Sequence, residues 1–220
     1  YLPPREMLSL YEGFQALYEK REVAFDETYY LLAKALGAPV LRGARHDEIK
    51  ALIAPLEKAT NSKVVKENER FYLKDASGKG IIEAHLVAEG FRKIGSLMHL
   101  ITNGELSKNS ILFWDEPESN LNPRLIKLVA TLLRQLAASG VQIFIATHDF
   151  LLTHYLSLFQ EYEEDPNVEL CFFSLTNDDK RGTLVEAGET LAEINHNSIL
   201  DEFAEYHDTE QRYFNQTLAE

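Results

Sequence analysis

The segment ILFWDEPE, residues 111–118, decides the fold of this chain. Four apolar residues run directly into two adjacent carboxylates, and a proline follows at once. A continuous apolar run of this kind predicts a strand that is buried on both faces, as in a parallel sheet covered by helices. Because an isolated buried carboxylate is unfavourable, the paired acids at the end of this strand call for a chemical reason.

The reason we favour is a cation at the carboxyl edge of the sheet, where open α/β folds bind their ligands. Asp115 would hold Mg²⁺ through oxygen, by way of water, and Glu116 would take a proton from an attacking water. The pattern therefore predicts the Walker B layout of a nucleotide hydrolase.

The residues that follow complete a βαβ unit. Asn122 and Pro123 predict the start of a helix whose apolar residues have helical spacing, and Ser139-Gly140 predicts its end. A second apolar strand, residues 141–146, then runs into Thr147-His148-Asp149. A strand, a helix and a strand in this length predict parallel strands, with His148 on the same sheet edge as the paired acids.

At this point the chain resembles the C-terminal half of an ABC-type ATPase head. The pattern is similar to that of SMC, RecF and OLD-like heads and of AAA-type ATPases in bacterial defence and toxin–antitoxin modules. The resemblance implies that Asp115 is the Mg²⁺-linked aspartate, Glu116 the catalytic base and His148 the switch histidine near the γ-phosphate. It also implies that residues 119–122, with Asn120 and Asn122, form the loop that crosses to the partner subunit. Turn and capping chemistry explains both asparagines equally well.

A signature-like motif is expected at the start of the preceding helix. An apolar helix is predicted to extend to Asn103-Gly104, and its first residues include Glu89, Gly90, Arg92 and Lys93. An exposed glycine at a helix N-terminus lets backbone amides approach an anion. The resemblance implies that this turn contacts the γ-phosphate on the opposite subunit, although the usual serine is replaced by Ala88. The alternative is an ordinary amphipathic helix with a basic, solvated first turn.

The chain has 220 residues, with 35 acidic and 22 basic side chains and a formal net charge of −13. This balance excludes a global basic field but leaves a local basic patch open. We expect another region or a partner to make most of the contacts with any nucleic acid. No apolar run reaches the ~20 residues that a membrane-spanning helix needs. The single cysteine, Cys171, lies in an apolar segment, so we predict that it is a packing residue rather than a reactive thiol. We therefore expect a cytoplasmic protein that does not enter the membrane.

The chain offers no convincing P-loop. Ser77-Gly78-Lys79-Gly80 lacks the earlier glycine, the hydroxyl residue after the lysine and the following helix that a phosphate cradle needs. We predict that it is the turn of a hairpin between strands 70–74 and 81–85. Because the chain begins at Tyr1 rather than Met, we expect the natural N-terminus, and the P-loop with it, to lie outside this sequence.

The remaining segments are expected to surround this core. Apolar periodicity predicts helices over residues 7–18, 26–37 and 47–56, which we group as a helical subdomain or insertion of residues 1–62. Residues 63–220 are then the ATPase lobe, with an antiparallel hairpin of strands 168–175 and 183–187 near its end. The predicted fold is an α/β P-loop NTPase head of the ABC type, C-terminal lobe.

We therefore expect an ATPase that binds ATP and Mg²⁺ when complete and is inactive as this chain alone. The resemblance implies a homodimer that closes on ATP and controls an effector, such as a nuclease, in phage defence or DNA repair. Two alternatives stay open. In the first, the chain is a non-hydrolytic module for dimerisation or interaction with a partner. In the second, the chain is a nuclease in which Asp115, Glu116 and Glu118 bind metal for phosphodiester cleavage. Acids with this spacing do not converge easily from one strand end, which speaks against the second.

Overall fold

The computed structural model describes residues 1–163, 165, 167–178 and 180–218, except for the side chains of residues 44–48 and 218. The chain divides into two compact units, Tyr1–Thr147 and His148–Glu220. The predicted boundary at residue 62 falls inside the first unit, where the last of three helices gives way to a strand, and it stays a prediction.

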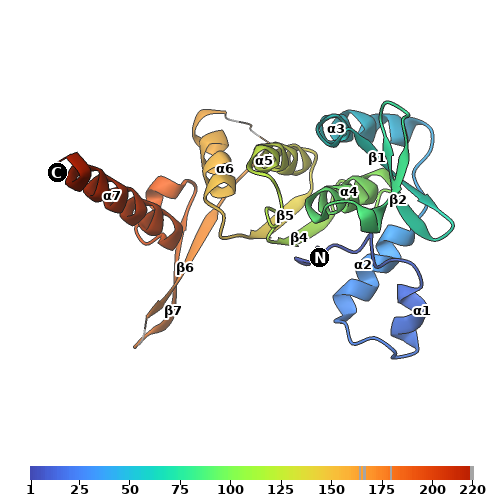
Figure 1. Cartoon of the computed structure of the whole chain (residues 1–220), viewed down its shortest axis with the longest axis horizontal. Coiled ribbons are helices and arrows are strands. Elements are labelled where there is room, and N and C mark those ends of the chain that lie inside the picture. Colours follow the sequence, from blue (N-terminus) through green and yellow to red (C-terminus); the bar gives the residue numbers. More distant parts are fainter. Residues whose placement is uncertain (164, 166, 179, 219–220) are drawn as a thin grey trace. The chain divides into compact units, whose positions relative to one another are not determined.

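The elements of the first unit appear at the right-hand side and centre of Figure 1. In chain order they are α1 (Phe14–Glu19), α2 (Glu27–Gly37), α3 (Ala44–Thr60), β1 (Ser62–Glu67), β2 (Arg70–Asp75), β3 (Ile81–Glu83), the 3₁₀ turn η1 (Ala84–Leu86), α4 (Glu89–Thr102), β4 (Ile111–Asp115), α5 (Pro123–Ala138) and β5 (Gln142–Ala146). The second unit contains α6 (Phe150–Tyr162), β6 (Phe172–Asp178), β7 (Gly182–Gly188), the 3₁₀ turn η2 (Leu191–Glu193) and α7 (Ser198–Leu218).

The predicted βαβ core is confirmed. β4 and β5 pair in parallel, with Asp115 opposite Ala146, and α5 connects them. Asn122 caps α5 by accepting a hydrogen bond from the Arg124 backbone N–H at 3.0 Å, and Pro123 occupies the first turn. At the other end Gly140 has a φ of 94°, the left-handed conformation that commonly ends a helix. Local chemistry at both ends of α5 therefore explains why the prediction succeeded.

The expectation that β4 is buried on both faces is wrong. Leu112 and Trp114 are buried, but the alternate residues Ile111 and Phe113 are 57% and 48% exposed. Phe113 stacks on the exposed Phe144 of β5 with ring centroids 4.8 Å apart. Side chains alternate between the faces of a strand, so helices cover one face of this pair and the other face is open.

The N-terminal segment is not the predicted helix. Only α1 is helical, and Leu2 instead forms a parallel bridge with Trp114 on the free edge of β4. Its backbone N–H donates to the Phe113 carbonyl at 2.7 Å, and its carbonyl accepts from Asp115 at 3.0 Å. Pro3 and Pro4 have no N–H with which to continue a ladder, and Gly13 enters the left-handed region with a φ of 69°.

Helix α4 forms the centre of the first unit. It contacts α2, α3 and β1, and in Figure 1 it lies between the antiparallel strands and the β4–β5 pair. Its fully buried residues include Ile94, Leu97 and Ile101. His99 is buried among them, and desolvation lowers its pKa to about 4, so it is a neutral core residue at physiological pH. Its Nε2 lies 3.0 Å from the Leu36 carbonyl.

The antiparallel sheet has one more strand than expected. β2 and β3 form the predicted hairpin, but β1 pairs with the other edge of β2. Asn68 and Glu69 make the first turn, both with positive φ, as a two-residue hairpin turn requires. The predicted helices over residues 26–37 and 47–56 are present as α2 and α3, although α3 begins earlier, at Ala44.

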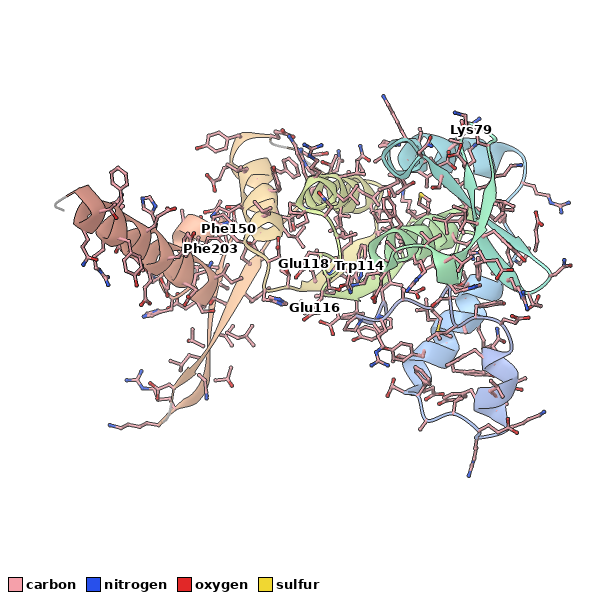
Figure 2. All side chains as sticks on the ribbon, in the orientation of Figure 1. Lys79, Trp114, Glu116, Glu118, Phe150 and Phe203 are labelled. Carbon is pink, nitrogen blue, oxygen red and sulfur yellow. The ribbon has the colours of Figure 1, made fainter. Side chains whose placement is uncertain are left out.

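The second unit contains the predicted antiparallel hairpin. β6 pairs with β7 from Phe172 opposite Gly188 to Asp178 opposite Gly182. Phe150 of α6 stacks on Phe203 of α7 with ring centroids 4.1 Å apart, and Figure 2 labels both. Within the described residues, every helix is too short or too polar to cross a membrane.

Candidate functional site

The paired acids lie where β4 ends. Asp115 is the last residue of the strand, and Glu116 leaves it with a φ of 47°, in the left-handed region that non-glycine residues rarely adopt. The Glu116 N–H still donates to the Ala146 carbonyl at 2.9 Å, one step beyond the parallel ladder. Figure 2 shows Glu116 and Glu118 just past Trp114. The turn therefore begins while the backbone is still anchored to β5.

Asp115 has the chemistry of a magnesium ligand. Its side chain is half-buried at the carboxyl edge of the sheet, and Oδ2 accepts a hydrogen bond from the Tyr1 hydroxyl at 3.3 Å. This exposed contact is one that a cation could replace. Mg²⁺ keeps several of its waters and needs only one or two carboxylates. Asp115 with Glu116 beside it therefore fits such an ion.

Glu118 also belongs to this group of acids, although the sequence indicates a role for it only in the nuclease alternative. It is 7% exposed, and its Oε1 accepts a hydrogen bond from the Thr147 hydroxyl at 2.7 Å. Its Oε2 is buried without a hydrogen-bond partner among the described residues. Glu118 thus connects the loop after β4 with the end of β5. No group of three or more metal-binding side chains occurs in the described part of the chain.

The glycine of the signature-like turn is buried, so the expectation that Gly90 is exposed is wrong. A Cβ atom built on Gly90 would lie 2.4 Å from the Asn120 carbonyl oxygen and 3.0 Å from the Leu121 side chain. The first turn of α4 therefore packs directly on the loop that follows the paired acids. Only glycine permits this approach.

The two basic residues that follow Gly90, Arg92 and Lys93, are engaged within the chain. Arg92 forms an ion pair with Glu6, with 2.7 Å between Nε and the carboxylate, and its guanidinium also donates to the Val87 carbonyl. Lys93 is 4% exposed and donates to the Glu116 carbonyl at 2.8 Å and to the Ser119 hydroxyl. Glu89, in the first turn of α4, is half-buried. The nucleotide-binding role predicted for these residues stays a prediction.

The remaining candidate residues are distributed between loops. Asn122 makes the cap described above, and Asn120 is exposed with a φ of 62°. Asp149 caps α6 by accepting from the Leu152 N–H at 2.6 Å. His148 follows the end of β5 and begins the second unit. The contacts of Asn120, Asn122 and His148 with a nucleotide stay predictions.

The segment that superficially resembles a P-loop is a hairpin turn, as predicted. Asp75 accepts a hydrogen bond from the Ser77 N–H at 2.7 Å, Gly78 has a φ of 76°, and β3 follows instead of a helix. Lys79 lies at this turn, far from Glu116 and Glu118 (Figure 2).

The solved structures that are similar to this chain include three of SMC proteins. The SMC head bound to the C-terminal winged-helix domain of ScpA has a TM-score of 0.47 and 14% identity, over 75% of this chain and 45% of that chain. A structure from work on ATP-driven dimerisation and DNA-stimulated activation of SMC ATPases has a TM-score of 0.46 and 12% identity, over 73% of this chain and 97% of that chain. The Smc head with an extended coiled coil, bound to the C-terminal domain of ScpA from Pyrococcus furiosus, has a TM-score of 0.45 and 14% identity, covering 87% and 42%.

This chain therefore spans less than half the length of two of these structures. No curated protein sequence matches it. Residues 6–153, which include both paired acids and the signature-like turn, match the family described as "AAA domain, putative AbiEii toxin, Type IV TA system". The α/β fold class and the relationship to AAA-type ATPases are thereby confirmed. The chain belongs to this AAA-domain family.

Proposed function

We propose that this chain is the C-terminal lobe of an ABC/SMC-like ATPase that binds and hydrolyses Mg-ATP when complete. The observation that supports this most is the arrangement at the end of β4. Asp115 ends a strand of the parallel pair, and Glu116 turns away from it on a backbone anchored to β5. This geometry would let Asp115 serve as a metal ligand and Glu116, the next residue, as a general base.

The chemistry needed for phosphoryl transfer to water is positioning and electrostatic stabilisation. Mg²⁺, when bound, would neutralise charge on the phosphate oxygens. Asp115 would hold that ion through a carboxylate oxygen, Glu116 would accept the proton of the attacking water, and His148 would contact the γ-phosphate. Glu89, Gly90, Asn120 and Asn122 would face a nucleotide held by the other subunit.

We further propose that two complete heads close on ATP and that closing controls an effector protein in phage defence or DNA repair, in the cytoplasm. The surface of α7 supports a protein partner. Phe203, Tyr206, Tyr213 and Phe214 are exposed along it. The helix also carries five acidic residues and one arginine, which favours a basic effector surface such as that of a nuclease.

The mass of the full-length protein tests this proposal. With Mg²⁺ and a non-hydrolysable ATP analogue, light scattering should give twice the mass found without nucleotide. Omission of Mg²⁺ is the control. If the mass is the same with and without nucleotide while the analogue is bound, ATP-driven pairing is wrong and the non-hydrolytic module is favoured. Metal-dependent nicking of DNA without ATP would instead favour the nuclease alternative.

A further inference from the structure

The most unusual side chain near the candidate site is a buried lysine. Lys93 lies in the second turn of α4 and is 4% exposed. Lysine is almost never fully buried unless it is paired, because its ammonium group is strongly hydrated. Both of its hydrogen bonds go to one loop, to the backbone carbonyl of Glu116 and to the hydroxyl of Ser119. Lys93 is therefore directed at the backbone of the candidate general base.

The backbone of Glu116 requires such support. Its left-handed φ of 47° is unfavourable for a residue with a Cβ and persists only when the surroundings hold it. The Glu116 N–H donates to Ala146 of β5, and its carbonyl accepts from both the Ser119 N–H, at 3.1 Å, and the Lys93 ammonium. The sheet thus holds one side of this residue, and α4 holds the other.

A second contact ties α4 to the same loop. Gly90 lies one turn before Lys93, so both residues are on one face of the helix. Gly90 packs against the Asn120 carbonyl so closely that no side chain fits there. The loop of residues 116–121 is therefore hydrogen-bonded to Lys93 at its start and packed against Gly90 near its end. A shift of the first turns of α4 would move this loop with it.

The charges around Lys93 match this arrangement. Desolvation lowers the pKa of Lys93, and the carboxylates of Glu118, Glu89, Glu116 and Asp115 oppose the shift, in that order of strength. The ammonium of Lys93 in turn balances the buried carboxylate of Glu118, which the Thr147 hydroxyl also binds. An apolar residue at position 93 would remove both the hydrogen bonds and this balancing charge.

We propose that Lys93 is a positioning residue that fixes the backbone of Glu116 and couples the first turns of α4 to the general base. This inference rests on the proposed ATPase function. It assigns the Lys93 ammonium to the loop of its own chain rather than to a nucleotide phosphate. Movement of α4 as two heads close would then reach Glu116 through Lys93 and Gly90.

The test compares Lys93→Met and Lys93→Arg in the full-length protein, with Lys79→Met on the remote hairpin turn as the matched control. Lys93→Met should lower kcat about 10- to 100-fold, the usual effect of losing a group that orients a functional residue. Its affinity for an ATP analogue should stay within about twofold of wild type, and Lys93→Arg should recover part of the loss. A tenfold loss of affinity with unchanged kcat would make Lys93 a phosphate ligand and overturn the proposal.

Hydrogen exchange without nucleotide gives an independent readout in the same proteins. The Ser119 and Leu121 amides donate to Glu116 and Glu118 within the loop. Lys93→Met should accelerate their exchange and leave the core amides of α4 and α5 unchanged, which also shows that the variant is folded. Unchanged exchange at both loop amides would contradict the positioning role. If the wild-type protein hydrolyses no ATP, the proposed function fails, and this exchange still decides whether Lys93 holds the loop.

Discussion

Glu116→Gln is expected to lower the ATP turnover of the full-length protein by about 10² to 10⁴-fold, the usual contribution of a general base. The amide keeps the size of the side chain but cannot accept the proton of the attacking water. The backbone contacts with Ala146 and Lys93 do not involve the side chain and should survive. Nucleotide affinity should therefore be unchanged. Steady-state turnover and analogue binding, measured on the same preparations, check both statements.

Glu67→Gln is the matched control for this experiment, because it makes the same chemical change at the exposed end of β1. It should leave turnover at the wild-type value. If Glu116→Gln also retains wild-type turnover, Glu116 is not the base. A parallel loss of affinity and turnover would instead mean that Glu116 contributes to binding of the nucleotide or its metal.

Gly90→Ala is expected to destabilise the first unit by about 1 to 3 kcal/mol, the range for overpacking a tight contact. The new Cβ atom would lie 2.4 Å from the Asn120 carbonyl oxygen, so the helix or the loop must move. Alanine is the better helix former by up to about 1 kcal/mol, which offsets part of the loss. Urea unfolding followed by Trp114 fluorescence measures the difference.

Gly80→Ala provides the control, since a Cβ there meets nothing within 4 Å and its φ is not in the left-handed region. It should change the free energy of unfolding by much less than Gly90→Ala. Equal stability of the two variants would show that α4 and the loop of residues 116–121 are not packed as closely as described. Turnover of Gly90→Ala should fall with its stability, because the displaced loop carries Glu116.

The sequence predicts well those parts of the fold that depend on residues close together in the chain. The start of α5 is defined by the side-chain cap of Asn122 and the fixed φ of Pro123. Its end is defined by the left-handed φ of Gly140. Asp26 and Asp149 cap α2 and α6 in the same way. Each of these effects depends on residues within one or two turns, so periodicity and capping suffice.

The features that were missed depend on contacts between distant segments. Leu2 extends along β4 because a free strand edge is available there, which no local pattern indicates. β1 is rich in lysine and half-exposed, so its pattern is weak, although Asn68 in its turn was a usable signal. β4 reads as a fully buried strand because apolar residues also occupy its open face, at Ile111 and Phe113.

The candidate site divides in the same way. Asp115 and Glu116 could be located from the sequence because a strand end and a turn place them. The burial of Lys93 could not, since lysine is normally a surface residue and its acceptors lie in a loop far along the chain. The sequence predicts an exposed glycine at position 90, whereas Gly90 is buried, because its close approach to Asn120 depends on how α4 packs.

Calorimetric titration of Mg-ATP, with this 220-residue chain and the full-length protein measured side by side, decides whether this chain is part of an ATPase. We expect saturable, Mg²⁺-dependent binding to the full-length protein and none to the chain alone, because this sequence offers no convincing phosphate-binding loop. Absence of binding to the full-length protein would contradict the ATPase assignment. Binding to the chain alone would contradict its description as a lobe that lacks the phosphate-binding loop.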